Sequence, residues 1–206
     1  MSNLYLVTDS EICAQAGHTV SQVVEEACRA GVRWVQLREK TVTTHAFIEL
    51  GFEVRQITQA YGAKLIVNDR VDVALAVDAD GVHVGQDDMP PALVRQLIGP
   101  GKVIGLSINS LLELQLAREV EVDYLGVATI FPTGTKQDTS SLLGLSGLRE
   151  ICQQTKLPTF AIGGINASNI RDVIRAGATG AAVVSAICGH PNPYEASKEL
   201  IQLAIT

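Results

Sequence analysis

The sequence predicts an α/β protein in which eight parallel strands and the helices between them close into a barrel. Stretches with a helical pattern repeatedly end at a Gly or Asp, and a short apolar segment follows. Examples are AGVRWVQL (30–37) and AGATGAAVV (176–184). Continuous Val, Ile and Leu bursts are typical of strands that are buried on both faces of a parallel sheet. Regular alternation implies right-handed crossovers, and eight units of about 26 residues favour a closed, single-domain (β/α)₈ TIM barrel.

The apolar bursts and the amphipathic stretches between them predict the elements in order. Strands are expected near residues 3–7, 33–37, 64–67, 81–84, 102–106, 124–128, 159–162 and 181–184. Helices are expected near residues 19–30, 44–61, 70–77, 91–98, 110–119, 143–154, 167–175 and 194–204. The alternative is a doubly wound open sheet with one unit miscounted. No linker rich in Pro, Gly or Ser divides the chain, so residues 1–206 are expected to form one TIM-barrel domain.

Composition limits the classes of function. Hydrophobic residues make up 47% of the chain and the net charge is −6, which indicates a globular protein and argues against bulk nucleic-acid binding. No apolar run reaches the roughly 20 residues of a membrane span, and MSNLYLVTDS lacks a secretory pattern. The four cysteines show no CxxC spacing, so we expect reduced thiols in a cytoplasmic protein. A homo-oligomer remains possible.

The chemistry of such barrels lies at the C-terminal ends of the strands. After the strand near 33–37, Gln36 and Arg38 are expected to point the same way, and Lys40 lies on the following loop. Two cations and an amide on one rim form a natural anion site, and Arg offers phosphate a planar fork. The alternative is a solvated cluster of charges.

Acidic side chains follow the next two strands. Asn68 and Asp69 come after one, and Asp88 comes after its neighbour. Because adjacent strands lie about 5 Å apart, Asp69 and Asp88 are within reach of one hard cation. Mg²⁺ prefers one or two carboxylates together with waters and substrate phosphates. The alternative is that either Asp is the N-cap of the helix that follows it.

The longest polar loop, IFPTGTKQDTSSLLGLSG (130–147), follows the sixth strand, and a plain surface excursion is the alternative to a functional loop. It supplies hydroxyls, a permissive backbone and a cation from Thr133, Gly134, Thr135 and Lys136. Beyond it, Gly163-Gly164 and Ser185 follow the last two strands, where barrels often bind phosphate. The rim thus predicts two phosphate-binding regions with a carboxylate pair between them. His83, Trp34 and Tyr124 are expected to be core residues.

Six motifs, in this order along the chain, resemble those of the thiamine phosphate synthase family: VQLREK, LIVNDR, DGVHVGQDD, IGLSIN, IFPTGTKQD and FAIGGIN. The resemblance covers nearly the full chain. It implies a Mg²⁺-dependent transferase that joins 4-amino-2-methyl-5-hydroxymethylpyrimidine diphosphate to 4-methyl-5-(2-hydroxyethyl)thiazole phosphate, with thiamine monophosphate and pyrophosphate as products. One departure is visible, because Ala128-Thr129 stands where the family usually shows Gly-Pro.

The resemblance also implies roles for individual residues. Those expected to bind the pyrimidine diphosphate are Gln36, Arg38, Lys40, Asn68, Ser107 and Lys136. Those expected to bind the thiazole phosphate are Thr133, Gly134, Thr135, Gly164, Val184 and Ser185. Asp69 and Asp88 would bind Mg²⁺. The implied mechanism has pyrophosphate leave first and the thiazole nitrogen attack the pyrimidine methylene cation, so Arg38, Lys40 and Lys136 would be catalytic through charge neutralisation.

Three alternatives remain. A homologous thiazole tautomerase would not need the diphosphate and Mg²⁺ residues. A non-catalytic regulator would bind thiamine phosphate without turnover. A phospho-sugar isomerase of the barrel class would need a base at a strand end, for which Glu39 is the sole candidate.

Overall fold

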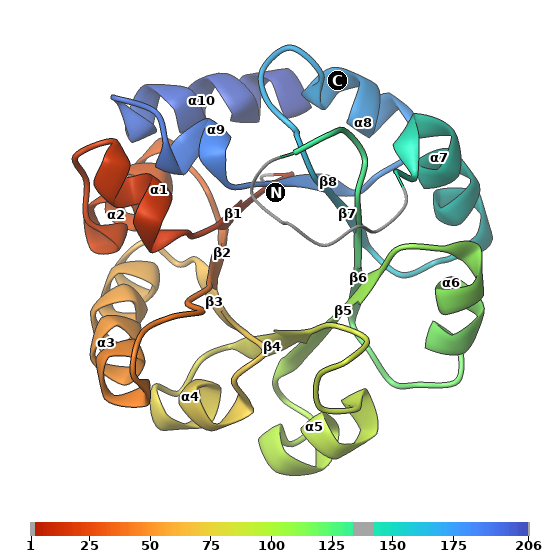
Figure 1. The fold of residues 1–206 in the computed structure, drawn as a ribbon, viewed down its shortest axis with the longest axis horizontal. Helices are drawn as coiled ribbons and strands as arrows, with labels where there is room; N and C mark the ends of the chain where they lie inside the picture. Colours follow the sequence, from red (N-terminus) through yellow and green to blue (C-terminus); the bar gives the residue numbers. More distant parts are fainter. Residues whose placement is uncertain (1–2, 134–141, 206) are drawn as a thin grey trace.

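Eight parallel strands form a closed barrel in which each strand pairs with its neighbours in chain order and β8 returns to β1. The computed structural model describes residues 3–133 and 142–205. Figure 1 views this barrel with its helices as an outer ring. The strands are β1 (Leu4–Val7), β2 (Trp34–Leu37), β3 (Lys64–Asn68), β4 (Gly81–Val84), β5 (Val103–Ile108), β6 (Tyr124–Val127), β7 (Thr159–Ile162) and β8 (Gly180–Val183). The predicted closed barrel is therefore confirmed over the open sheet.

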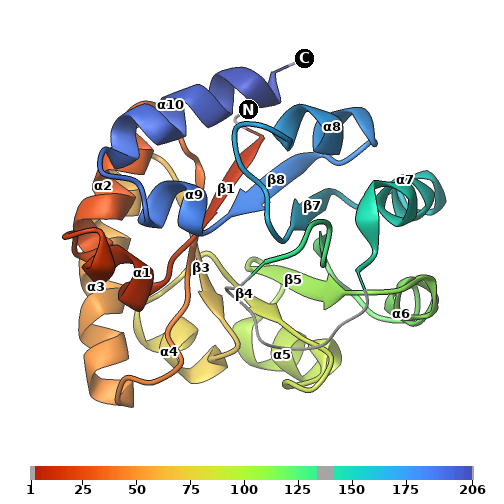
Figure 2. The same ribbon diagram turned by 45° about the horizontal axis from the view of Figure 1, so that its top comes forward.

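Helices follow the strands around the outside of the barrel (Figure 2). They are α1 (Ser10–Gln15), α2 (Val20–Ala30), α3 (Thr44–Ala60), α4 (Val71–Ala76), α5 (Pro91–Ile98), α6 (Leu111–Ala117), α7 (Gly144–Gln154), α8 (Ile170–Arg175), α9 (Ser185–Cys188) and α10 (Pro193–Ala204). The eight predicted helices correspond to all of these except α1 and α9. Those two are too short to show a helical period in the sequence. They lie side by side, so the segments after β1 and β8 meet at one edge of the barrel.

Local signals explain where the longer helices begin. Thr19 caps α2, because its side chain accepts from the Gln22 N–H while the Gln22 side chain accepts from the Thr19 N–H. Thr43 and Asn192 cap α3 and α10 by similar hydrogen bonds. Such caps satisfy backbone donors that the first turn of a helix leaves without a partner.

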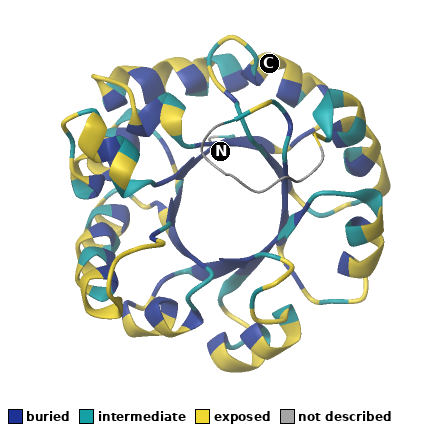
Figure 3. Cartoon of the chain, viewed as in Figure 1, coloured by how far each residue is buried: buried dark blue, intermediate teal, exposed yellow. Residues whose placement is uncertain are grey.

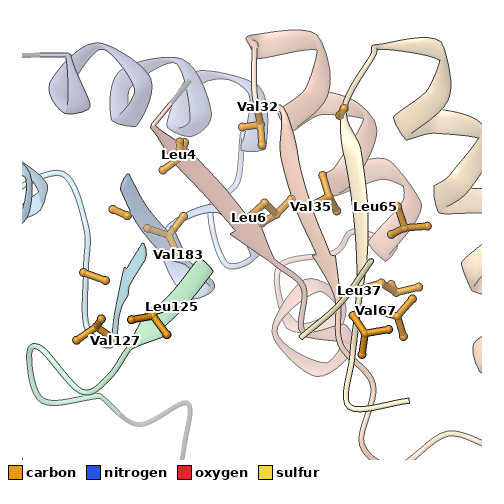
Figure 4. Close-up of a cluster of buried hydrophobic side chains, with 14 of the residues drawn as sticks. Leu4, Leu6, Val32, Val35, Leu37, Leu65, Val67, Leu125, Val127 and Val183 are labelled. Atoms are coloured by element: carbon orange, nitrogen blue, oxygen red, sulfur yellow. The ribbon is translucent and has the colours of Figure 1, made fainter. Parts of the chain in front are cut away.

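Strand side chains alternate between two apolar layers. In β1, Leu4 and Leu6 belong to the layer between strands and helices, whereas Tyr5 and Val7 point into the barrel. Figure 4 shows the outer layer on β1, β2, β3, β6 and β8. In Figure 3 the strands are buried, and exposed residues lie on the outer faces of the helices. Every strand is thus covered on both sides, which explains its continuous apolar sequence.

Aromatic rings fill the interior of the barrel below its C-terminal rim. Tyr5, Trp34, Tyr124 and Phe160 pack with ring centroids 5.2 to 6.0 Å apart, mostly edge to face. This cluster is a floor, so any ligand must bind above it. Among the described residues, no helix combines the length and apolar character that crossing a membrane requires.

Candidate active site

A cavity opens above the aromatic floor at the C-terminal ends of the strands. The space between its lining residues amounts to about 960 Å³ when the open solvent at its mouth is included. Most of the predicted substrate-binding residues line it: Gln36, Arg38, Asn68, Ser107, Thr133, Gly164, Val184 and Ser185. These residues come from six different strand ends or following loops, and closure of the barrel brings them around one space. Gly134, Thr135 and Lys136 lie outside the described residues.

The strand end of β2 holds Arg38 through contacts with the segment after β1. The backbone N–H of Arg38 donates to Thr8 Oγ1 at 3.0 Å, and its Nη1 lies 3.4 Å from Asp9 Oδ2. Thr8 is fully buried, and Asp9 also caps α1 by accepting from the Ile12 N–H. Neither Thr8 nor Asp9 was predicted from the sequence, although both follow an apolar segment as the other rim residues do.

The two predicted metal ligands, Asp69 and Asp88, lie near Lys40, and none of these three residues is among those that line the cavity. Lys40 Nζ donates to Asp69 Oδ2 at 2.5 Å, and Asp88 Oδ2 accepts from the Gly85 N–H at 2.7 Å. Burial raises the pKa of Asp88, and a hydrogen bond with the Asp69 carboxyl raises it further, whereas the Lys40 charge acts in the opposite direction. The two carboxyl groups therefore lie close enough for Asp69 to raise the pKa of Asp88.

Neither carboxylate occupies the helix N-cap position that was its alternative role. The N-cap of α4 is Arg70, and that of α5 is Pro90. Asp69 instead has a left-handed backbone conformation, with φ of 59°, and its N–H donates to the His83 carbonyl at 2.8 Å. Asp and Asn adopt this conformation more readily than most residues.

The donor set fits Mg²⁺ rather than a metal held by protein alone. Within residues 3–133 and 142–205, no three His, Cys, Asp or Glu side chains are grouped as a metal site. Two neighbouring carboxylates leave most positions of an octahedral ion to water and phosphate oxygens, as Mg²⁺ prefers. A divalent cation would also relieve the repulsion between the two carboxylates.

The opposite wall is built from the ends of β7 and β8. Thr133, Gly164 and Ser185 line both this cavity and a more open groove beside it. At Gly164 a Cβ atom would lie 2.6 Å from the Pro132 carbonyl oxygen, so only glycine fits there. α9 begins at Ser185, and the first backbone N–H groups of a helix have no partner within it. This wall is suited to a phosphate group.

The cavity floor contains polar groups that the sequence analysis had assigned to the core. His83 and Tyr124 are buried, as predicted, but they are also hydrogen-bonded to each other and line the cavity. His83 Nδ1 lies 2.9 Å from Tyr124 Oη, and His83 Nε2 lies 2.8 Å from Ser107 Oγ. The available signal was their position on inward-facing strand sites, where a polar atom needs a partner.

Glu39 is turned away from the cavity. Its Oε2 accepts from Ser10 Oγ at 2.8 Å, while Oε1 is buried without a hydrogen-bond partner among the described residues. Burial raises the pKa of this carboxyl. Glu39 thus packs against α1 between Arg38 and Lys40, and it does not occupy the place that an isomerase base would need.

Ala128 and Thr129, which replace the Gly-Pro usual in the resembling family, both line the cavity. The peptide bond between them is cis.

Comparison with known proteins identifies the family of this chain. A family model described as thiamine monophosphate synthase matches residues 4–187. The chain belongs to the thiamine monophosphate synthase family. The thiamine-phosphate synthase of Chloroflexus aurantiacus is 51% identical over 197 residues, which span 96% of this chain and 90% of that protein. That of Archaeoglobus fulgidus is 45% identical over 98% of this chain and 92% of its own length.

A solved structure of the same family has the same fold. The thiamine phosphate pyrophosphorylase from Pyrococcus furiosus superposes with a TM-score of 0.89 at 40% identity, over 98% of this chain and 94% of that one. The resemblance seen in the sequence motifs is therefore confirmed at the level of the thiamine monophosphate synthase family.

Proposed function

We propose that this chain condenses 4-amino-2-methyl-5-hydroxymethylpyrimidine diphosphate with 4-methyl-5-(2-hydroxyethyl)thiazole phosphate, releasing thiamine monophosphate and pyrophosphate. The observation that carries the proposal is one cavity that joins Arg38 at the end of β2 to a glycine and hydroxyl wall at β7 and β8. Full-length similarity to thiamine-phosphate synthases supports the choice of substrates. Both proposed substrates are small phosphorylated metabolites, and four free thiols fit a reducing cytoplasm.

The cations at the end of β2 would hold the pyrimidine diphosphate and stabilise its departure. Arg38 presents a fork for phosphate oxygens, and Lys40 adds a mobile charge beside it. Gln36, Asn68 and Ser107 would contact the same substrate. Lys136, which lies outside the described residues, would add a third cation from the loop after β6. Removing one such contact is expected to cost on the order of 10²–10³ in rate.

The opposite wall would bind the thiazole phosphate and direct its ring. Thr133, Gly164 and Ser185 line the space shared by both cavities, with Val184 beside them. Gly134 and Thr135 would complete the phosphate site. The carbon–oxygen bond to pyrophosphate breaks, the electron-rich aminopyrimidine stabilises the methylene cation, and the thiazole nitrogen donates its electron pair to that carbon. The walls need only hold the two rings in line, so no covalent nucleophile is required.

Asp69 and Asp88 would hold Mg²⁺, which when bound would offset the negative charge of the diphosphate. Their proximity, which is seen in the effect of Asp69 on the pKa of Asp88, supports this assignment. Lys40 already pairs with Asp69, so the same group of charges would serve both the metal and the substrate.

The test is to mix the purified protein with both substrates and Mg²⁺ and to follow pyrophosphate and thiamine phosphate together. Wild type is compared with Asp88→Ala and with Asp87→Ala, an exposed neighbour that serves as the matched control. We expect stoichiometric formation of both products, loss of activity with chelator, and a strong reduction only in Asp88→Ala. Mg²⁺ should also raise the unfolding temperature of wild type and of Asp87→Ala without substrates, but not that of Asp88→Ala.

Each contrary outcome has a distinct meaning. Folded protein that forms no product at any Mg²⁺ concentration would contradict the proposed reaction. The thiazole tautomerase and the non-catalytic regulator would then be the functions to test. Undiminished activity in Asp88→Ala would keep the reaction and remove the metal assignment.

A further inference from the structure

A continuous chain of hydrogen bonds crosses the cavity floor from β2 to β5. Gln36 Nε2 donates to Tyr5 Oη at 3.0 Å, and Tyr5 Oη lies 2.9 Å from Tyr124 Oη. Tyr124 Oη lies 2.9 Å from His83 Nδ1, and His83 Nε2 lies 2.8 Å from Ser107 Oγ. Its two ends, Gln36 and Ser107, are both proposed to contact the pyrimidine substrate.

The fold makes room for this chain at two glycines. A Cβ atom at Gly105 would lie 2.1 Å from Tyr124 Cζ and 2.4 Å from His83 Nδ1. One at Gly126 would lie 2.9 Å from His83 Cε1. Two neighbouring strands therefore lack side chains where the middle of the hydrogen-bond chain passes. The barrel backbone thus leaves the space that Tyr124 and His83 occupy.

Each member of the chain has a limited number of protons. Burial raises the pKa of both Tyr5 and Tyr124 far above neutral pH, so each hydroxyl keeps one proton and donates once. A neutral imidazole has one donor nitrogen and one acceptor nitrogen. A hydroxyl that accepted from both of its neighbours would leave its own buried proton without an acceptor in the chain, so every proton is used only when all links run in the same direction.

In the direction that starts from the Gln36 amide, every proton has a defined place. Tyr5 accepts from Gln36 and donates to Tyr124, and Tyr124 donates to Nδ1 of His83. His83 then carries its proton on Nε2 and donates to Ser107. This leaves Oε1 of Gln36 as an acceptor and the Ser107 hydroxyl as a donor at opposite sides of the floor.

The reverse direction exchanges these properties without changing the number of protons. The proton of His83 moves from Nε2 to Nδ1, each hydroxyl rotates, and the Gln36 amide turns so that its oxygen accepts from Tyr5. Gln36 then presents its NH₂ group, and Ser107 presents an acceptor. The two ends of the chain cannot change independently.

We propose that the direction of this chain sets the hydrogen-bonding pattern that Gln36 and Ser107 present to the pyrimidine ring, and that the tautomer of His83 records that direction. This inference rests on the proposed function for the identity of the ring. His83, Tyr5 and Tyr124 act in it as positioning residues. An aminopyrimidine offers a donor N–H to Oε1 of Gln36 and selects the Nε2–H tautomer. A 4-oxo analogue, which replaces that donor by an acceptor, selects the Nδ1–H tautomer.

The experiment reads the ¹⁵N chemical shifts of the His83 imidazole, in which protonated and unprotonated nitrogens are well separated. His83→Asn identifies the signals among those of the four histidines. Gln36→Glu is recorded at a pH at which the new carboxylate is ionised, because that group can only accept from Tyr5. We expect Nε2–H in free wild type and Nδ1–H in Gln36→Glu. With Tyr5→Phe added, the effect of Gln36→Glu should vanish, since the connecting hydroxyl is gone.

Tyr194→Phe is the matched control, because this tyrosine lies on α10, where its ring contacts Arg29. It should leave the effect of Gln36→Glu intact. A folded Gln36→Glu protein with an unchanged tautomer would overturn the inference, as would a change that persists in the Tyr5→Phe background. A cationic His83 or an Nδ1–H tautomer in free wild type would also overturn it.

A second arm needs no variant and covers the case in which Gln36→Glu fails to fold. Wild type is saturated with 4-amino-5-hydroxymethyl-2-methylpyrimidine or with its 4-oxo analogue, both without diphosphate. Opposite tautomers support the inference, and the same tautomer with both bound overturns it. Because these readouts need no turnover, a protein that responds as expected but forms no thiamine phosphate would contradict only the proposed reaction.

Discussion

The carboxylate of Asp9 joins the start of α1 to the guanidinium of Arg38. Oδ1 of Asp9 accepts from the Ile12 N–H at 3.1 Å, and Oδ2 lies 3.4 Å from Arg38 Nη1. Both side chains are largely buried, with relative exposures of 17% for Asp9 and 19% for Arg38. One residue that no motif singled out therefore couples a helix terminus to the proposed anion site.

Two substitutions at Asp9 should separate its two roles. Asp9→Asn keeps an N-cap oxygen but removes the charge that faces Arg38, whereas Asp9→Ala removes both. We expect Asp9→Ala to lower the free energy of unfolding by about 1 kcal/mol and Asp9→Asn to change it little. Both should lower kcat/KM for the pyrimidine diphosphate on the order of tenfold, because Arg38 is less well held. Denaturant unfolding and steady-state kinetics measure the two effects, and full activity in Asp9→Asn would contradict the second role.

Glu39→Gln should change the pH dependence of stability but not the reaction. Because burial raises the pKa of Glu39, the folded protein holds this proton to higher pH than the unfolded chain does. Its contribution to stability is fully present below the ordinary Glu pKa of about 4.3 and is lost as pH rises through the raised value. The substituted glutamine side chain does not ionise, so Glu39→Gln does not lose this contribution. Its free energy of unfolding relative to wild type should therefore increase between the ordinary and the raised pKa and then level off.

Urea unfolding of both proteins at a series of pH values tests this difference. Turnover of Glu39→Gln should match that of wild type, since Glu39 faces Ser10 rather than the cavity. A collapse of activity in a stable Glu39→Gln protein would favour a base at this position, as an isomerase requires.

Gly164→Ala and Gly62→Ala form a matched pair, because both glycines have φ of +62°. At Gly62 a Cβ atom would meet nothing within 4 Å, whereas at Gly164 it would lie 2.6 Å from the Pro132 carbonyl oxygen. Gly62→Ala should therefore cost only the backbone strain of about 1–2 kcal/mol. Gly164→Ala should cost more and should raise KM for the thiazole phosphate, while KM for the pyrimidine diphosphate changes less. Equal stability losses and unchanged KM values would show that the wall at β7 does not bind this substrate.

Gly105→Ala tests whether the floor of the cavity depends on the missing side chain. The added Cβ would lie 2.1 Å from Tyr124 Cζ, so the ring must move and the hydrogen bond to His83 must change. We expect a loss of roughly 1–3 kcal/mol, as overpacking of a core usually gives, together with weaker pyrimidine binding. Gly101→Ala is the control, since nothing lies within 4 Å of its Cβ position. Thermal unfolding and ligand titration measure the two effects. A Gly105→Ala protein with the stability and pyrimidine affinity of wild type would show that Tyr124 can shift freely.

The strands were predictable because burial on both faces leaves a continuous apolar run in the sequence. Each of the eight observed strands overlaps a predicted one, and rim residues such as Arg38 and Asp69 could be found as the polar positions that follow. The helices α1 and α9 were missed, since six and four residues are too few to establish a period. Their positions depend on contacts between the segments that follow β1 and β8 rather than on a local sequence pattern.

The N-cap alternative for Asp69 and Asp88 illustrates a different limit. A helix follows each carboxylate within a few residues, so the sequence was compatible with capping and with metal binding alike. The structure places the caps at Arg70 and Pro90 and brings the two carboxyl groups together. Their proximity depends on β3 and β4 being neighbours with a particular register, which local sequence does not encode.

The amino-acid sequence by itself determined the barrel, the order of its strands and the rim positions where charged and small residues collect. Those properties follow from hydrophobic periodicity and from chain direction, which act over short stretches. Only the tertiary structure decided which polar groups meet inside the barrel. Tyr5 and Tyr124 are 119 positions apart, yet their hydroxyls lie 2.9 Å from each other. Closure of the sheet places β1 and β6 across one lumen, and buried hydroxyls there must find partners on whatever strand faces them.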